Sequence, residues 1–405
     1  MTKIEIAGLA DICSFVTDGT HDSPRLQESG VPFIKGKHIN SGRVDFDGCD
    51  YITREDHEKC IKRVKPQLDD ILMANIGASI GDCARVTTNT EFSIKNVALL
   101  RPDPEKVDPS YFFHLVKSGT FQGRLMNIRL GSAQPYVSLT ALRGFGVPVV
   151  SDIASQRRIG EIFTAYDNLI ENNRRRIALL EQAARLLYRE WFVHFRFPGH
   201  ETAKFVDGLP RGWDHVTSSE AMQINPKTTW DKTQSKQIRL FPMAALSESG
   251  MSCDESKFEH RDKSTSVRFM NGDTLFARIT PCLENGKTGF TNFLDEGEVA
   301  CGSTEFIIFR EGLVSRYFIY LMAREDGFRQ NAITSMVGSS GRQRVQPSCF
   351  DKFNVSVPPV EIAKEFDGMV APMFQQIQAA QKANQQLTRA RDLLLPRLMD
   401  GRLPV

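Results

Sequence analysis

An internal duplication constrains the fold of this chain more than any other feature of its sequence. Similar runs recur in the same order at a spacing of about 205 residues. The matching segments are residues 70–74 with 273–277, 131–132 with 338–339, 145–148 with 353–358, and 180–192 with 387–399. The chain is therefore expected to fold as two related halves.

Each half is predicted to contain a globular domain followed by one long helix. Alternating apolar residues and Gly, Asn and Asp turns indicate strands, and a Val-Pro boundary precedes each helix. The expected strands are residues 31–34, 70–76, 97–101, 274–279 and 305–309. The predicted segments are residues 1–151, 152–198, 199–359 and 360–405. The fold class is α+β: two similar mixed α/β domains separated by two long helices that form an antiparallel coiled coil.

The helices carry apolar seams with heptad spacing. The first seam is Phe163, Tyr166, Ile170, Asn173, Ile177, Leu180, Ala184, Leu187 and Trp191. The second is Val370, Met373, Ile377, Ala380, Asn384, Leu387, Arg391, Leu394 and Leu398. This spacing is typical of a coiled coil, and the alternative is that each helix docks on its own domain. Asn173 and Asn384 can fix the register, and Pro372 is expected to kink the second helix or delay its start.

The length of the first helix gives the arrangement a functional meaning. A helix over residues 152–192 would be a rod about 60 Å long at 1.5 Å per residue. Such a rod would keep the duplicated domains apart at a fixed separation. Two similar domains held in this way match a DNA target with two half-sites roughly 34–36 Å apart.

Composition bounds the class of protein without deciding its function. The 405 residues, 41% of them hydrophobic, predict two or three domains. No apolar run approaches the ~20 residues that span a bilayer, and no signal-peptide block is present, so a cytoplasmic location is expected. The net charge of +2 permits nucleic-acid binding but does not indicate it. The 8 scattered cysteines predict reduced, mostly buried thiols and no metal site.

The sequence offers no convincing catalytic motif. Asn285-Gly286-Lys287-Thr288 is similar to the end of a phosphate-binding loop, but Pro281 stands where the loop requires its first glycine and has no amide hydrogen. An adenine methyltransferase needs a polar-Pro-Pro-aromatic loop, whereas the dipeptide Pro358-Pro359 is flanked by valines. No Gly-x-Ser-x-Gly elbow or His-Glu-x-x-His helix is present. We therefore expect a chain that is not an enzyme.

Several local runs resemble the specificity subunits of type I restriction–modification systems. The first long helix is similar to the central helix of that family, and Leu209-Pro210-Arg211-Gly212-Trp213 is similar to the entry into its second target-recognition domain. The helix residues that carry this resemblance are Gln156, Ile159, Asp167, Ile170, Asn172, Asn173, Leu180, Glu181 and residues 188–193. Residues 276–287 and 341–347 resemble segments of those domains, and residues 18–21, 33–39 and 80–82 match more loosely.

The resemblance implies a division of labour between subunits. The specificity subunit would bind double-stranded DNA and two modification subunits, which methylate adenine with S-adenosylmethionine. Restriction subunits could join this assembly and cleave DNA with ATP-driven translocation. S-adenosylmethionine and ATP would then be bound by the partner subunits, and this chain would carry no cofactor.

Base-specific recognition needs side chains that form paired hydrogen bonds with base edges, such as Arg or Lys with guanine and Asn or Gln with adenine. The candidates in the first half are Lys35, Lys37, Asn40, Asn75, Gln134 and Tyr136. Those in the second half are Arg278, Asn285, Lys287, Arg342, Gln343 and Arg344. For each single residue, a solvated or structural role remains the alternative.

Partner binding is predicted on the helices. The candidate residues are Trp191, Phe192, Phe195, Leu394 and Leu398, although burial of the aromatic rings against the chain's own domains is the alternative. Two other functions remain open: a coiled-coil scaffold without sequence-specific DNA binding, and a DNA-modifying enzyme with an unrecognised site. A scaffold would not need similar polar loops at matching places in both halves.

Overall fold

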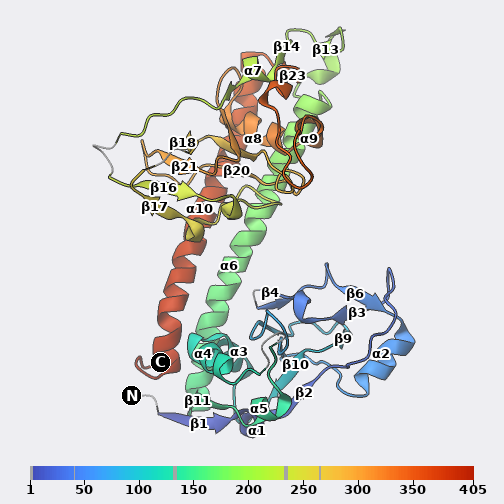
Figure 1. Ribbon diagram of the computed structural model, residues 1–405, viewed down its shortest axis with the longest axis vertical. Coiled ribbons are helices and arrows are strands. Elements are labelled where there is room, and N and C mark those ends of the chain that lie inside the picture. Colours follow the sequence, from blue (N-terminus) through green and yellow to red (C-terminus); the bar gives the residue numbers. More distant parts are fainter. Residues whose placement is uncertain (1–2, 41, 131–134, 232–235, 264–265) are drawn as a thin grey trace. The chain divides into compact units, whose positions relative to one another are not determined.

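The computed structural model describes residues 3–40, 42–130, 135–231, 236–263 and 266–405. The chain divides into two compact units, Met1–Ile170 with Gln385–Val405, and Glu171–Asn384. Each unit contains one sheet-rich domain and one stretch of each long helix, as Figure 1 shows. This division differs from the four predicted segments because each long helix packs in both units.

The first domain is built around a four-stranded antiparallel sheet. Its strand order is β2 (Cys13–Asp18), β10 (Ala98–Pro102), β7 (Ile71–Met73) and β8 (Cys83–Arg85). The residues of β7 are fully buried, as expected for a continuous apolar run at the centre of a sheet. The other strands are β1 (Ile4–Gly8) with β11 (Gly146–Val150), β6 (Asp50–Ile52) with β3 (Val31–Ile34) and β9 (Ser93–Ile94), and β4 (Ile39–Asn40) with β5 (Arg43–Val44). The helices are α1 (Leu9–Ile12), α2 (Arg54–Ile61), α3 (Pro109–Lys117), α4 (Gly119–Asn127), α5 (Leu139–Arg143) and the 3₁₀ turn η1 (Gly36–His38).

The second domain repeats this topology. Its equivalent sheet has the order β15 (Gln223–Ile224), β22 (Phe306–Arg310), β19 (Thr274–Ala277) and β20 (Thr288–Phe290). A second sheet has the order β17 (Glu259–Arg261), β16 (Ile238–Phe241), β21 (Ala300–Gly302) and β18 (Arg268–Phe269). Two pairs complete the strands: β12 (Phe205–Val206) with β13 (Leu209–Pro210), and β14 (Asp214–Thr217) with β23 (Asn354–Val357). The short helices are η3 (His200–Thr202), α7 (Ser218–Ala221), η4 (Met243–Ala245), η5 (Glu255–Lys257), α8 (Arg316–Arg324), α9 (Asp326–Thr334) and η6 (Pro347–Cys349). The predicted duplication is confirmed.

One buried ion pair marks the duplication at the level of single atoms. In the first domain, Arg101 donates two hydrogen bonds to the carboxylate of Asp70, at 2.7 and 2.8 Å. In the second, Arg310 does the same to Asp273, at 2.7 and 2.6 Å. Both carboxylates are at most 1% exposed and lie just before the central strand of their sheet. The pairing leaves neither carboxylate buried without a partner.

The long helices are α6 (Ile153–Tyr188), which continues into the π-helical turn η2 (Arg189–Val193), and α10 (Val360–Met399). Within the second unit they run antiparallel, because Asn173 bonds Asn384 at 2.9 Å and Arg176 bonds Gln376 at 2.9 Å. The side-chain amide of Asn173 thus donates a hydrogen bond to the side-chain oxygen of the other seam asparagine, Asn384. Supercoiling of the pair stays a prediction.

The expectation that Pro372 delays the second helix was wrong. Helix α10 begins at Val360 and includes Pro372 in its interior. A proline there loses one backbone hydrogen bond, at a cost of about 3 kcal/mol. The flanking Val370 and Phe374 are almost fully buried against the second domain, and this packing offsets the cost.

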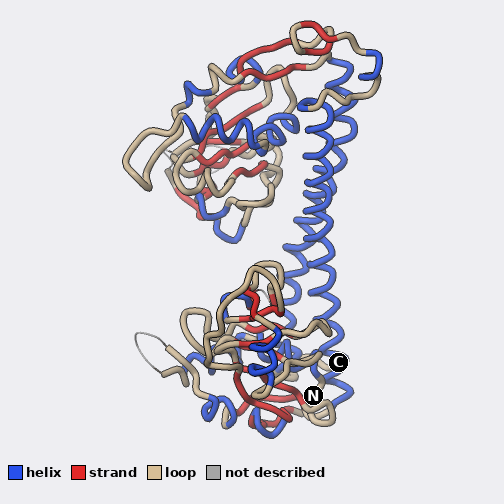
Figure 2. Tube along the Cα trace, turned by 90° about the vertical axis from the view of Figure 1, so that its right-hand side faces the viewer, coloured by secondary structure: helices blue, strands red, loops and turns tan. Residues whose placement is uncertain are grey.

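Each helix also packs on a domain, as the alternative prediction proposed. Ile159 and Phe163 of α6 are fully buried in the core of the first unit, and Phe366 and Ile377 of α10 in the core of the second. In Figure 2 the strands of each unit lie together with the long helices beside them. Among the described residues no helix could cross a membrane.

Candidate nucleic-acid interface

In the second domain, two loops that are distant in the sequence meet beyond the end of strand β19. One follows strand β19 and contains Arg278, and the other contains Arg342, Gln343 and Arg344. Arg344 forms antiparallel bridges with Ile279 and with Val337. Backbone bonds from Val345 N to Arg278 O (2.8 Å) and from Thr280 N to Gln343 O (3.1 Å) fasten the loops together. The structure therefore brings the predicted residues of both loops to one place.

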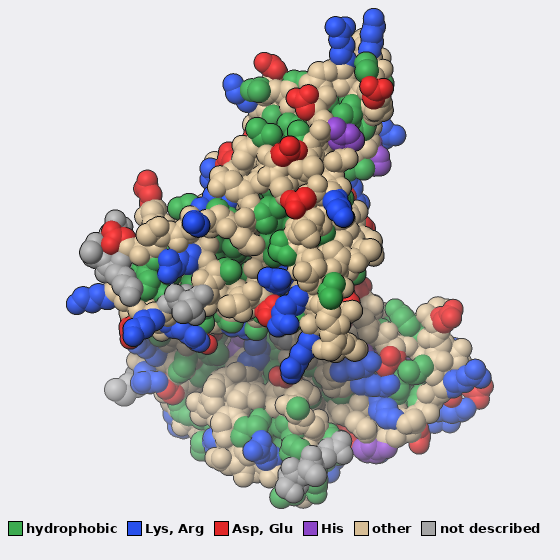
Figure 3. Space-filling view, turned by 45° about the horizontal axis from the view of Figure 1, so that its top comes forward, with side chains coloured by type: hydrophobic (Ala, Val, Ile, Leu, Met, Phe, Trp, Pro, Cys, Tyr) green, Lys and Arg blue, Asp and Glu red, His purple; other side chains and the backbone are tan. Residues whose placement is uncertain are grey.

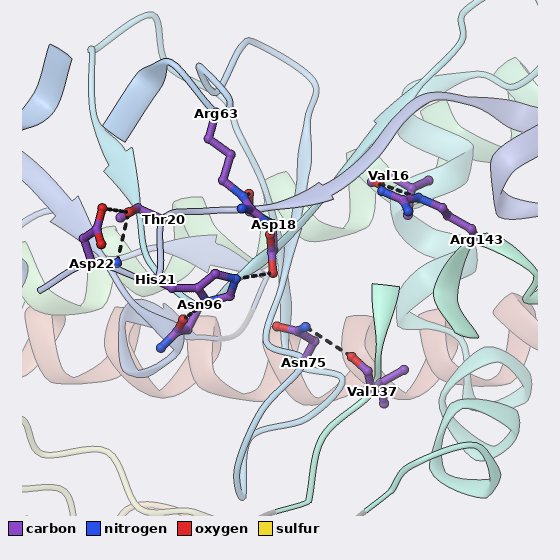
Figure 4. A network of polar contacts seen from close by, with 10 residues as sticks. All are labelled: Val16, Asp18, Thr20, His21, Asp22, Arg63, Asn75, Asn96, Val137 and Arg143. Atoms are coloured by element: carbon purple, nitrogen blue, oxygen red, sulfur yellow. Dashed lines mark hydrogen bonds and ion pairs between the residues drawn. The ribbon is translucent and has the colours of Figure 1, made fainter. Parts of the chain in front are cut away.

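The first domain joins the corresponding loops in the same way. Tyr136 forms bridges with Ile76 and Leu130, the counterparts of those made by Arg344. Val137 N donates to Asn75 O at 2.8 Å, and the Asn75 amide donates to Val137 O at 3.2 Å. Figure 4 shows this side-chain contact. The predicted Gln134 lies outside the described residues.

Asn75 and Arg278 occupy equivalent positions and do the same structural work. The Arg278 guanidinium donates to Val345 O at 3.1 Å, as the Asn75 amide does to Val137 O. Asn75 is only 5% exposed, and Arg278 is half-buried. In this structure both side chains hold the loops in position.

The other polar side chains at the joined loops of the second domain differ in how strongly the protein holds them. Arg342 is exposed, and Gln343 is half-buried and anchored through its backbone N, which donates to Thr280 Oγ1 at 3.1 Å. Arg344 donates three hydrogen bonds to Glu305, at 3.0, 2.9 and 2.7 Å. These bonds raise the pKa of Arg344, so it is a fixed cation.

The loop after residue 280 presents Asn285 and Lys287. The Asn285 amide donates to Glu248 Oε1 at 3.3 Å, and its side chain is exposed. Lys287 is half-buried and forms no ion pair within the part of the chain that the structure describes. A cation with no internal partner is available to a phosphate or a base.

The first domain adds a separate basic turn, η1. Lys35 and Lys37 both contact Asp50, with nitrogen–oxygen distances of 2.8 and 3.5 Å. The hydrogen bond from Lys35 lowers the pKa of Asp50, which is the first residue of β6, so the two lysines at the turn share one carboxylate. Asn40 is exposed, and its amide donates to Lys37 O at 3.1 Å.

The structure adds His21 and Asn96 to the edge of the first sheet (Figure 4). The His21 side chain is 57% exposed, with Nε2 3.2 Å from Asp18 Oδ2 and Nδ1 2.8 Å from Asn96 Oδ1. Arg63 also bonds the buried Asp18 carboxylate. We did not predict this group because Asn96 reaches His21 only through the pairing of β2 with β10, which the sequence does not reveal.

The residues predicted to bind partners are mostly internal. Trp191 and Phe192 are 4% and 6% exposed and pack on Phe366 of α10, with ring centroids 5.6 and 4.7 Å apart. Leu398 is 6% exposed, whereas Phe195 and Leu394 are half-buried. The aromatic rings therefore stabilise the second unit, and a partner would have to contact exposed neighbours.

A metal site would require several His, Cys, Asp or Glu side chains grouped together among the residues that are described. No group of three or more His, Cys, Asp or Glu side chains there could hold a metal ion. All the cysteines are free thiols. On the face drawn in Figure 3, basic and acidic side chains are interspersed rather than gathered in one basic patch.

Comparison with known proteins gives a consistent set of relatives. Residues 1–182 match the model of the type I restriction modification DNA specificity domain. The chain is 22% identical to the type I restriction enzyme MjaIX specificity subunit of Methanocaldococcus jannaschii, over 96% of this chain and 91% of that one. It is 32% identical to the EcoEI specificity subunit of Escherichia coli, over 37% of this chain and 26% of that one. The crystal structure of the S subunit from M. genitalium superposes with a TM-score of 0.60 at 13% identity, covering 98% of this chain and 96% of that one, which supports the fold.

Proposed function

Because this chain belongs to the specificity subunits of type I restriction–modification systems, we propose that it recognises a bipartite, asymmetric DNA sequence through its two domains. One observation carries the proposal. The same pair of loops is joined by the same bridges in both domains, but the residue at the bridged position differs: it is Tyr136 in one domain and Arg344 in the other. A shared scaffold with different hydrogen-bonding groups suits two half-sites of different sequence.

The binding partners and chemistry follow from this role. The chain would recruit modification subunits that methylate adenine with S-adenosylmethionine, and restriction subunits that use ATP could join them. It would bind DNA without acting on it. A scaffold without DNA recognition would have no use for the repeated loop pair, so that alternative is not favoured.

The first experiment is co-expression with a type I modification subunit and genome-wide mapping of methylated adenines. We expect methylation at one bipartite motif with a fixed gap. The double variant Arg342→Ala with Arg344→Ala should relax only the second half-site, by about 1–3 kcal/mol for each base that is no longer hydrogen-bonded. Tyr136→Ala is the matched change in the first domain, because Tyr136 forms the bridges equivalent to those of Arg344, and it should relax only the first half-site. Methylation without any shared motif, or variants that relax both half-sites equally, would contradict the proposal.

We propose that two modification subunits bind, one to each unit. Ile162 on α6 and Met369 on α10 occupy the same position in their helices and are 36% and 45% exposed. Leu186 and Leu393 form a second equivalent pair, 53% and 55% exposed. The first unit therefore exposes Ile162 and Leu393, and the second unit exposes their equivalents Met369 and Leu186. Two units with equivalent exposed residues suit two copies of one partner.

Native mass spectrometry of the purified complex tests this stoichiometry. Leu186→Asp and Leu393→Asp should each remove one modification subunit, and the double variant should remove both, because a carboxylate would be desolvated in the interface. Leu313→Asp, at a loop residue 65% exposed, is the control. Retention of both subunits by the double variant would refute this docking surface.

A further inference from the structure

A hollow in the second unit lies between helix α6 and the loop at residues 247–252. Its volume is about 410 Å³. On the helix side its lining includes Arg174, Arg185 and Arg189, together with Glu181, Gln182 and Leu186, and on the loop side it includes Ser247, Ser249 and Ser252. The hollow is separate from the joined loops beyond the end of strand β19, so base reading does not account for it.

The positive charge of the hollow is only partly neutralised within the protein. Arg189 is paired with Glu325, at 2.9 Å, but Arg174 and Arg185 form no ion pair among the described residues. Glu181 also borders the hollow, yet it is 4% exposed. Its carboxylate oxygens accept bonds from Tyr320 Oη (2.6 Å) and Met251 N (2.8 Å), so the carboxylate is held in place and its one negative charge offsets only part of the charge of the arginines. The hollow is therefore cationic.

The serine loop has a fixed shape. Ser247 Oγ accepts hydrogen bonds from the backbone N of Ser249 and Gly250, at 3.2 and 3.1 Å. A Cβ at Gly250 would lie 3.2 Å from the Glu181 carboxylate, so the loop approaches the helix closely there. Serine hydroxyls and arginine guanidinium groups are the donors that commonly contact DNA phosphates.

The serine loop is connected to the DNA-reading loop that contains Asn285 and Lys287. Glu248 accepts from the Asn285 amide at 3.3 Å. The buried Arg324 donates to Gly286 O at 2.7 Å and to Glu248 O at 3.3 Å, which ties both loops together. The hollow is thus connected to the segment with Asn285 and Lys287, two of the residues predicted to bind DNA, although it is separate from the joined loops around Arg278 and Arg344.

We propose that the hollow binds phosphate groups of the DNA backbone beside the second half-site, with Arg174 and Arg185 as the main contacts. This inference rests on the proposed function, which it extends from base recognition to a sequence-independent contact. The two arginines are about 16 Å apart along the helix axis at 1.5 Å per residue. Since phosphates on one strand rise by about 3.4 Å each, the arginines would neutralise separate phosphates.

The test uses the complex with modification subunits and compares wild type with Arg174→Ala/Arg185→Ala. Binding to a duplex with the methylated motif and to an unrelated duplex is measured over a range of salt concentrations. The slope of log K against log salt should become shallower by about 2, because each phosphate contact contributes about 0.9. Affinity should fall equally for both duplexes, and the charge-conserving variant Arg174→Lys/Arg185→Lys should keep the slope close to that of wild type.

Arg175→Ala is the matched control, because Arg175 is on the same helix but pairs with Glu171 at 3.1 Å. An unchanged slope in the alanine double variant would overturn the inference. So would loss of a modification subunit from that variant, which would assign the arginines to the partner. Titration with inorganic pyrophosphate and with ATP tests a free-phosphate ligand: tight binding that the double variant abolishes, with the DNA slope unchanged, would also overturn it.

The outcomes separate this inference from the proposed function. If wild type shows no preference for any bipartite motif, the proposed function fails. In that case a shallower slope on the unrelated duplex still supports the phosphate site. If wild type discriminates its motif but the double variant keeps the full slope, only the phosphate site fails.

Discussion

The two domains share a topology but differ in the polarity of their interiors. His114, the sixth residue of α3, is 2% exposed, whereas Leu321 occupies the same position in α8 and is fully buried. Asp167 of α6 contacts Lys117 and Arg391, at 3.1 and 2.6 Å. The equivalent position of α10 is Phe374, which packs on aromatic rings instead. The fold therefore tolerates either solution, and only features common to both domains are required by it.

The largest effect is expected at the buried pair that the domains do share. Asp70→Ala would leave the Arg101 guanidinium without its carboxylate, and Asp273→Ala would do the same to Arg310. Each variant should lose about 3–5 kcal/mol of unfolding free energy, the usual cost of breaking a buried pair.

Urea unfolding read by pulse proteolysis, with peptides of each unit quantified separately, measures this loss. Glu91→Ala is a control, since that carboxylate is 38% exposed and pairs with Arg54 and Lys65. A large loss from one substitution and none from the other would show that the pair is not a common requirement of the two domains.

The second expected effect is a difference between the two units in how their stability depends on pH. Burial lowers the pKa of His114 to about 3 from an ordinary value of 6.5, and the nearby Asp167 only partly opposes this. The unfolded chain therefore takes up the proton first, so the stability contributed above pH 6.5 is lost as the pH falls towards 3. At about 1.4 kcal/mol per pH unit, the first unit should lose about 2 kcal/mol between pH 6.5 and 5.

Burial also lowers the pKa of His38 and His57, both in the first domain. The histidines of the second unit are exposed or half-buried. All 3 tryptophans, Trp191, Trp213 and Trp230, belong to the second unit, so their fluorescence reports on that unit alone. Acid should unfold the first unit before this fluorescence changes, and His114→Leu should narrow the gap. Simultaneous loss of both units at every pH would argue against this asymmetry.

A third, smaller difference is expected at the equivalent residues Asn75 and Arg278. Arg278→Ala removes a charge-assisted bond to Val345 O, worth about 1.5–3 kcal/mol, whereas Asn75→Ala removes a neutral bond worth about 1 kcal/mol. Each variant should weaken discrimination of its own half-site because the joined loops would loosen. Thermal unfolding and competition binding measure the two effects, and equal destabilisation would mean that the charge contributes nothing there.

Periodicity and duplication revealed the architecture but could not reveal how side chains pair. The seam positions of Asn173 and Asn384 were predictable, and the structure joins them to each other. The loops around Asn75 and Arg342 were identified because they recur in both halves. By contrast, the sequence could not decide between burial of Trp191 and its contact with a partner, because a bulky ring in a helical stripe gives the same pattern in both cases. The structure buries this side chain. His21 with Asn96 was missed because strand pairing, not sequence distance, brings them together.

The smallest effect is a reciprocal exchange of charge between the domains. The turn η1 carries Lys37, whose side chain is 63% exposed, while the equivalent turn η4 has the exposed Ala244. Lys37→Ala should make the salt slope of DNA binding shallower by about 1, and Ala244→Lys should steepen it by a similar amount. Each change in affinity should be below about 1 kcal/mol, because exposed charges interact weakly through water.

Measurement on specific and unrelated duplexes separates phosphate binding from base recognition: a change confined to the specific duplex would make Lys37 a base-reading residue. If Ala244→Lys had no effect while Lys37→Ala did, the two domains would place their equivalent turns differently on DNA.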